Sequence, residues 1–194
     1  MRVAPVGLSF YGEPARAFDI GCDVAAITHG HPSGCLSAGC LAALVAGVIA
    51  GQPLKEASQE AVPMLRQEPG HEECLAAVRA GIELASGGRP SPEEIESLGG
   101  GWVGEEALAI SLCCALCSPD DYATAILLAV NQGGDSDSTG AITGNILGAL
   151  LGKTAIPRRW LARLELRTEI EALAEDLLVG FRDSEEWRQR YPGC

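Results

Sequence analysis

Residues 34–51 read GCLSAGCLAALVAGVIAG, a stretch that is apolar on every side and built mostly from small residues. The stretch is long enough to cross a membrane, but glycine is frequent in it and strongly hydrophobic side chains are few. A helix that is apolar all round also occurs at the centre of a soluble helical bundle. We therefore predict a buried core helix, in which Gly47 and Gly51 would let a neighbouring backbone approach closely.

Further helices are expected on both sides of this segment, because apolar residues recur with helical spacing and turn residues separate the runs. The expected helices are residues 53–67, 72–86, 103–117, 122–131, 141–151 and a last amphipathic one carrying Ile170, Leu173, Leu177 and Leu178. A capping box at Ser91 predicts one more, short helix. No segment alternates with period two for long enough to be a strand. The sequence thus predicts an all-α fold, forming a single domain over residues 1–194.

Charge and cysteine content limit the classes of partner and compartment. The chain has 26 acidic and 14 basic residues and a formal net charge of -12, which argues against nucleic acid or an anionic membrane as a partner. The first residues lead into no apolar signal segment. Most of the eight cysteines lie among apolar neighbours, as reduced thiols do, so we expect a cytoplasmic protein. Cys114 and Cys117 have no second ligand pair, which excludes a zinc site.

The segment NQGGDSDSTG, residues 131–140, carries the clearest chemical signal. Asp135 and Asp137 follow two glycines at the start of a helix, where two carboxylates can reach one small volume. Such oxygen ligands suit magnesium, calcium or manganese. An EF-hand is excluded because Ile146 stands where that calcium loop needs a bidentate glutamate. A simple helix cap is the remaining alternative, although a cap needs only one side chain.

The segment GGDSDSTGAITG, residues 133–144, resembles the C-terminal signature of the ADP-ribosylglycohydrolase family, which includes dinitrogenase reductase-activating glycohydrolases. Segments 1–7 (MRVAPVG), 28–32 (THGHP) and 102–108 (WVGEEAL) match the family in the same order. The resemblance implies an orthogonal multi-helix bundle with two Mg²⁺ or Mn²⁺ ions in a cleft. It also implies hydrolysis of the N- or O-glycosidic bond between ADP-ribose and a protein side chain or small acceptor, so the expected partner is an ADP-ribosylated protein or a small ADP-ribose conjugate.

The resemblance also implies roles for individual residues. Asp135, Asp137 and Ser138 would be metal ligands, with Ser138 supplying a hydroxyl where many members have threonine.

The same resemblance places His29 beside bound ADP-ribose; the alternative is a histidine with structural hydrogen bonds alone. Ser33 and Gly34 open a helix and would offer backbone N–H groups to phosphate. Trp102 would stack on a ring of the ligand or, alternatively, pack in the core.

Part of the family pattern has no counterpart in these 194 residues. The N-terminal glutamate, Thr-Asp-Asp run and Gly-Asn-Gly loop of the family are not found, and Glu105 and Glu106 are assigned no catalytic role. The catalytic carboxylate is therefore unknown, and we expect an N-terminally truncated domain, to be completed by an N-terminal segment or chain. Two alternatives stay open: an inactive ADP-ribose-binding module and a helical interaction protein.

Overall fold

A computed structural model describes residues 1–180 and 182–193. All the regular secondary structure within these residues is helical, which confirms the all-α prediction. The chain separates into two compact units, Met1–Pro157 and Arg158–Cys194. Each unit is described by itself, and the expectation of a single domain remains a prediction.

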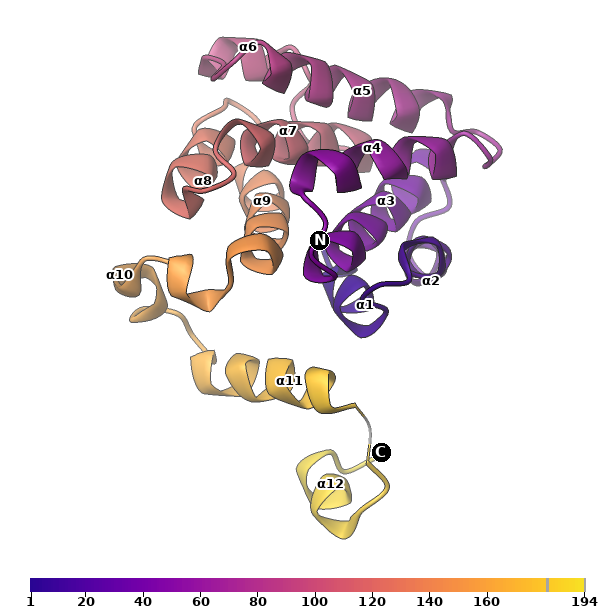
Figure 1. The fold of residues 1–194 in the computed structure, drawn as a ribbon, viewed down its shortest axis with the longest axis vertical. Helices are drawn as coiled ribbons and strands as arrows, with labels where there is room; N and C mark the ends of the chain where they lie inside the picture. The colour runs from indigo at the N-terminus through magenta and orange to yellow at the C-terminus, as the bar shows by residue number, and fades with distance from the viewer. Residues whose placement is uncertain (181, 194) are drawn as a thin grey trace. The chain divides into compact units, whose positions relative to one another are not determined.

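The first unit is a helical bundle in which some helices run alongside one another and others cross steeply. In Figure 1, α5 runs alongside α7, and α9 runs steeply across α7. The helices are α1 (Ala4–Ser9), α2 (Pro14–Ala26), α3 (Pro32–Ile49), α4 (Leu54–Leu65), α5 (Glu72–Ser86), α6 (Pro92–Glu96), α7 (Gly104–Cys117), α8 (Tyr122–Val130) and α9 (Ser136–Leu151), with a short 3₁₀ turn, η1 (Lys153–Ala155).

Helix α3 lies at the centre of this bundle and contacts α1, α2, α4, α5, α7 and α9. Its length and composition alone would allow it to cross a membrane, yet 72% of it is buried inside the structure. Pro32 at its first turn suits the start of a helix, where the missing N–H leaves no bond unmade. The predicted buried core helix is therefore confirmed.

Small residues let α2 approach α3, but at another position than the sequence suggested. A Cβ atom added to Gly39 would lie 2.5 Å from the Cys22 Sγ atom of α2. By contrast, Gly47 faces the side chain of Gln52, and Gly51 adopts a φ of +94° in the turn after the helix. The close contact between α2 and α3 thus falls at Gly39.

The cysteines that the structure describes are all free thiols, four of them buried, and Cys194 lies outside the described residues. Cys114 is buried in α7, and burial raises the pKa of its thiol to about 12. Such a thiol stays protonated and behaves as a small apolar side chain.

Gly148 lies within helix α9, where glycine is less favourable than alanine. Alanine would fit at this position, because nothing lies within 4 Å of a Cβ atom built there. Gly148→Ala should raise the free energy of unfolding by about 0.5–1 kcal/mol through better helix propensity, measured by urea denaturation. Gly144→Ala in the same helix is the control: its Cβ would lie 3.0 Å from the Tyr122 hydroxyl oxygen, so it should gain less. A less stable Gly148→Ala protein would contradict the expectation.

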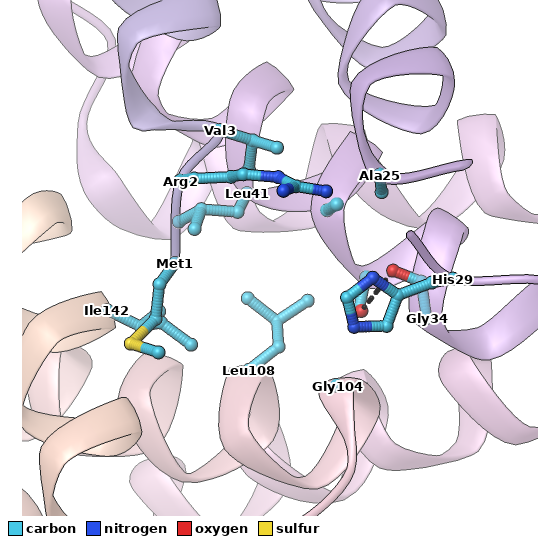
Figure 2. A pocket seen from close by; sticks show the side chains of 12 residues that line it. Met1, Arg2, Val3, Ala25, His29, Gly34, Leu41, Gly104, Leu108 and Ile142 are labelled. Atoms are coloured by element: carbon cyan, nitrogen blue, oxygen red, sulfur yellow. Dashed lines mark hydrogen bonds between the residues drawn. The ribbon is translucent and has the colours of Figure 1, made fainter. Parts of the chain in front are cut away.

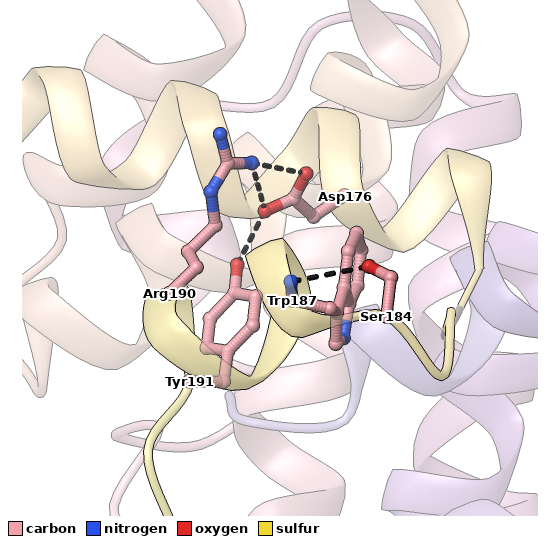
Figure 3. A network of polar contacts seen from close by, with 5 residues as sticks. All are labelled: Asp176, Ser184, Trp187, Arg190 and Tyr191. Carbon is pink, nitrogen blue, oxygen red and sulfur yellow. Dashed lines mark hydrogen bonds and ion pairs between the residues drawn. The ribbon is translucent and has the colours of Figure 1, made fainter.

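The second unit contains α10 (Arg158–Leu161), α11 (Arg167–Val179) and α12 (Glu185–Arg190). Figure 3 shows Arg190 and Tyr191, at the end of α12, pointing to Asp176 of α11. The Arg190 Nη1 group donates to both Asp176 carboxylate oxygens at 2.7 and 2.8 Å, and the Tyr191 hydroxyl donates at 2.6 Å. The Tyr191 hydroxyl and then the Arg190 guanidinium lower the pKa of Asp176. These bonds tie α12 to α11.

The helix predicted near the end of the chain is present as α11, but the other helices of the second unit do not cover its apolar stripe. Ile170, Leu173 and Leu177 are 47%, 48% and 41% exposed, and Leu178 is 82% exposed. Helical spacing therefore predicted the secondary structure correctly without predicting burial.

Candidate active site

The turn between α8 and α9 holds the acidic motif, and buried polar side chains set its shape. Gln132 is 4% exposed, and its Oε1 atom accepts from the Gly134 N–H at 2.6 Å. Its Nε2 group donates to the Thr139 hydroxyl at 3.4 Å. That hydroxyl in turn donates to the Ala129 carbonyl at the end of α8, at 2.8 Å. The turn is thus fixed from within, although the sequence analysis gave neither Gln132 nor Thr139 a role.

Asp135 is the N-cap residue of α9, where its carboxylate accepts from the Ser138 N–H at 3.4 Å. The neighbouring side chains of Asp137 and then Ser138 lower the pKa of this carboxyl group below its usual value. The two acidic side chains therefore meet at the helix N-terminus, which favours negative charge. Asp135 does cap the helix, as the simpler alternative supposed, and Asp137 adds a second acid to that cap.

A glycine loop before α7 is held against this acidic turn. The Gly100 carbonyl accepts from the Asp135 N–H at 2.8 Å. On the other side, the Gly100 and Gly101 N–H groups both donate to the Glu106 carboxylate at 3.0 Å. Gly101 has a φ of +75°, a conformation that favours glycine. Glu106 therefore positions the loop. In the sequence, three glycines followed by a helix with a carboxylate in its first turn could have indicated the contact between Glu106 and the loop.

Trp102 follows the glycine loop and is 74% exposed. Of the two alternatives that the sequence left open, core packing is therefore wrong. The indole stands where a ligand ring can reach it.

His29 lies just beyond the C-terminus of α2 and is connected to two residues that sequence analysis did not single out. Its Nδ1 atom lies 2.8 Å from the Thr28 hydroxyl oxygen. The Arg2 Nη2 group donates to that same hydroxyl and to the Val24 carbonyl, the latter at 3.2 Å. Arg2 and Thr28 both belong to segments that match the family pattern, which was the available signal.

These parts meet in one cleft of about 300 Å³ within the first unit. Asp135, Ser138, His29 and Trp102 all line the cleft, together with Arg2. Four of the seven residues predicted for the site are therefore brought together, from segments that lie far apart in the sequence.

A smaller, mostly apolar cavity of about 110 Å³ adjoins the cleft, and the two share His29 and Arg2. In Figure 2, Arg2 extends across this cavity towards the wall that carries Ala25 and His29, with Gly34 beside the imidazole ring.

Three predicted site residues lie outside the main cleft. The Ser33 side chain is buried and donates to the Glu73 carboxylate at 2.7 Å. Gly34 lines the smaller cavity, and its N–H donates to the His31 carbonyl at 3.1 Å, so that N–H already has an acceptor. Asp137 is exposed beside Asp135. Phosphate binding by Ser33 and Gly34 remains a prediction.

The oxygen donors of the acidic turn fit one side of a hard-cation site. Within residues 1–180 and 182–193, no group of three or more His, Cys, Asp or Glu side chains is arranged to hold a metal ion. Asp135, Asp137 and Ser138 would therefore supply only part of a ligand set.

Comparison with known proteins bears directly on this cleft. The model of the family described as ADP-ribosylglycohydrolase matches residues 1–186. The chain belongs to this family. The ADP-ribosylglycohydrolase fold is all-helical, and the resemblance seen in the sequence is confirmed.

Individual members of the ADP-ribosylglycohydrolase family are similar over most or part of the chain. ADP-ribosyl-[dinitrogen reductase] glycohydrolase of Rhodospirillum rubrum is 29% identical over 175 residues, covering 88% of this chain and 51% of its own length. An uncharacterized protein of Archaeoglobus fulgidus is 31% identical over 179 residues, 91% of this chain and 56% of its own. ADP-ribosylarginine hydrolase Tri1 of Serratia proteamaculans is 48% identical over 63 residues, 32% of this chain and 17% of its own. The chain thus spans about half the length of the Rhodospirillum rubrum and Archaeoglobus fulgidus relatives.

Proposed function

We propose that this chain forms the metal-binding and nucleotide-binding side of a hydrolase that cleaves the N- or O-glycosidic bond between ADP-ribose and a protein side chain or small acceptor. The cleft that brings Asp135, Ser138, His29 and Trp102 together carries this proposal. Family membership supports it. The free thiols support a cytoplasmic location, which fractionation of cells would test.

Asp135, Asp137 and Ser138 would hold Mg²⁺ or Mn²⁺, and we expect two ions in a complete site. When bound, the ions would orient the ribose and help to activate the attacking water. The acidic side chains would also oppose the positive charge that develops on the sugar as the glycosidic bond breaks. The residue that moves the proton is not assigned, and a complementing N-terminal segment or chain would supply it.

Trp102 is expected to stack on a ring of the ligand. Trp102→Ala should weaken ADP-ribose binding roughly 10-fold, since stacking on an aromatic side chain is worth about 1–3 kcal/mol, while the free energy of unfolding stays unchanged because the indole is exposed. Calorimetric titration with ADP-ribose measures the affinity. Tyr11→Ala, an exposed aromatic outside the cleft, is the control. Equal affinities of both variants would contradict the stacking role.

Release of ADP-ribose from ADP-ribosyl-arginine in the presence of Mg²⁺ tests the proposed hydrolysis. Turnover by the chain, alone or with a complementing N-terminal chain, would support it. The partial ligand set favours a second candidate, a module that binds ADP-ribose without cleaving it. This candidate predicts that ADP-ribose binds but that no substrate is hydrolysed, whether the chain is tested alone or with a complementing N-terminal chain. If the chain neither binds nor cleaves, and captures a defined protein partner, a helical interaction protein remains.

A further inference from the structure

We infer that Arg2 and Thr28 are positioning residues that hold neutral His29 in the Nε2–H tautomer, so that its ring presents a hydrogen-bond donor to the cleft. The chemical target of that donor is an acceptor oxygen of the ligand, on a phosphate or a ribose. This last step rests on the proposed function, whereas the tautomer is a property of the folded chain.

The Thr28 hydroxyl has one hydrogen and must divide its bonds between three neighbours. Arginine can only donate, so the contact from the Arg2 Nη2 group uses Thr28 Oγ1 as an acceptor. Two atoms then compete for the hydroxyl hydrogen: the His29 Nδ1 atom at 2.8 Å and the Ala25 carbonyl at 3.5 Å. The shorter bond is the stronger one. The opposite pattern, in which His29 Nδ1–H donates to the second lone pair of Thr28 Oγ1, leaves the hydroxyl hydrogen only the weak 3.5 Å bond to Ala25. We therefore assign the hydroxyl hydrogen to the bond with His29 Nδ1 and the ring proton to Nε2.

Arg2 strengthens this arrangement in two ways. A charge-assisted bond to the Thr28 oxygen polarises the hydroxyl and makes it a better donor to the ring. The second bond of Arg2, to the Val24 carbonyl near the C-terminus of α2, fixes the guanidinium where the helix dipole favours a cation. Three residues from two segments thus form one chain of hydrogen bonds ending at Nδ1.

The other ring nitrogen stays available to a ligand. The ring lines the cleft beside Arg2. Among residues 1–180 and 182–193, no group forms a hydrogen bond with His29 Nε2. The ligand proposed for this cleft is rich in phosphate and hydroxyl oxygens, which accept hydrogen bonds. A ring locked as a donor at Nε2 is matched to them, and the opposite tautomer would present a lone pair instead.

Nitrogen-15 NMR of the imidazole rings tests the tautomer directly, since the chain has only three histidines. In protein held above the ordinary histidine titration range, at about pH 8, the His29 signals should show a protonated Nε2 and an unprotonated Nδ1. His29→Gln assigns the signals. A predominant Nδ1–H form in the unaltered protein would overturn the inference without any variant.

Substitutions of Thr28 show whether its hydroxyl sets the tautomer of His29 or only contributes to the fold. Thr28→Val removes the hydroxyl at nearly constant shape and should give His29 a mixture of tautomers, and Thr28→Ser should restore the Nε2–H form. Thr168→Val, an exposed threonine of α11, should change nothing. An unchanged His29 tautomer in Thr28→Val would also overturn the inference.

The consequence for binding is measured with ADP-ribose as the probe. Thr28→Val should weaken its binding roughly 10-fold, since a hydrogen bond to a charged group is worth about 1.5–3 kcal/mol. If the tautomer responds as expected but ADP-ribose does not bind the unaltered chain, the proposed function fails and the positioning role stands. If ADP-ribose binds equally to both proteins while the tautomer changes, the assigned donor role of Nε2 is wrong.

Discussion

Asp135→Asn is expected to lower hydrolysis of ADP-ribosyl-arginine roughly 100-fold or more, because a metal ligand contributes several kcal/mol to transition-state stabilisation. Asparagine caps a helix about as well as aspartate, so the bond from the Ser138 N–H to this side chain should survive. The substitution removes one charge and one oxygen donor only. The free energy of unfolding should therefore stay nearly unchanged while Mg²⁺ or Mn²⁺ binding, measured by calorimetry, is lost.

Asp121→Asn provides a matched control, since Asp121 caps α8 in the same manner, with its carboxylate accepting from the Thr124 N–H at 3.0 Å, and does not line the cleft. It should leave both activity and ion binding unaltered. The ion-binding measurement remains decisive even for a chain that does not turn over substrate. If Asp135→Asn bound ions as the unaltered protein does, the metal assignment would be wrong.

Gly134→Ala should be the most disruptive small substitution in the first unit. A Cβ atom at this position would overlap the Gly100 carbonyl oxygen and lie 2.6 Å from its carbon. Neither side can move freely, because the neighbouring Asp135 N–H is bonded to that same carbonyl. We expect the free energy of unfolding to fall by about 1–3 kcal/mol, the usual cost of overpacking, in urea denaturation. The acidic turn should also separate from the glycine loop, so ADP-ribose binding should weaken.

The neighbouring glycine supplies the comparison. A Cβ atom on Gly133 would meet the Glu96 Oε1 atom at 2.8 Å, the mobile end of a flexible side chain that can shift. Gly133→Ala should therefore cost clearly less stability than Gly134→Ala. Equal losses from both substitutions would show that contact with the Gly100 backbone does not limit this turn.

Local chemistry made much of the fold predictable. The helix expected at residues 72–86 is present with those bounds as α5. The capping box at Ser91 is present as well: its hydroxyl accepts from the Glu94 N–H at 3.2 Å, and the Glu94 carboxylate accepts from the Ser91 N–H at 2.7 Å. Such signals lie within a few neighbouring residues, so no tertiary information is needed to recognise them.

Contacts between distant segments limited what the sequence could predict about the site. The Arg2–Thr28 bond joins residues 26 positions apart, and no local pattern indicates it. Ser33 makes a second contact of this kind. Its hydroxyl donates to the Glu73 carboxylate of α5, 40 positions further along the chain, and the phosphate contact expected from its backbone N–H stays a prediction. The acidic motif was recognisable because its two carboxylates lie only two positions apart in sequence, whereas the glycine loop that Glu106 holds against it comes from a distant segment.

The backbone of Gly100 limits how the substrate preference of such a cleft can change. Its N–H donates to the Glu106 carboxylate and its carbonyl accepts from the Asp135 N–H, so the loop that carries Trp102 and the turn that carries the proposed metal ligands are joined through one residue. An insertion in this loop, made to admit a bulkier acceptor, would displace the acidic turn at the same time. New substrate preferences on this scaffold are therefore expected to come from exchanging the side chain at position 102, with the length of the loop kept constant.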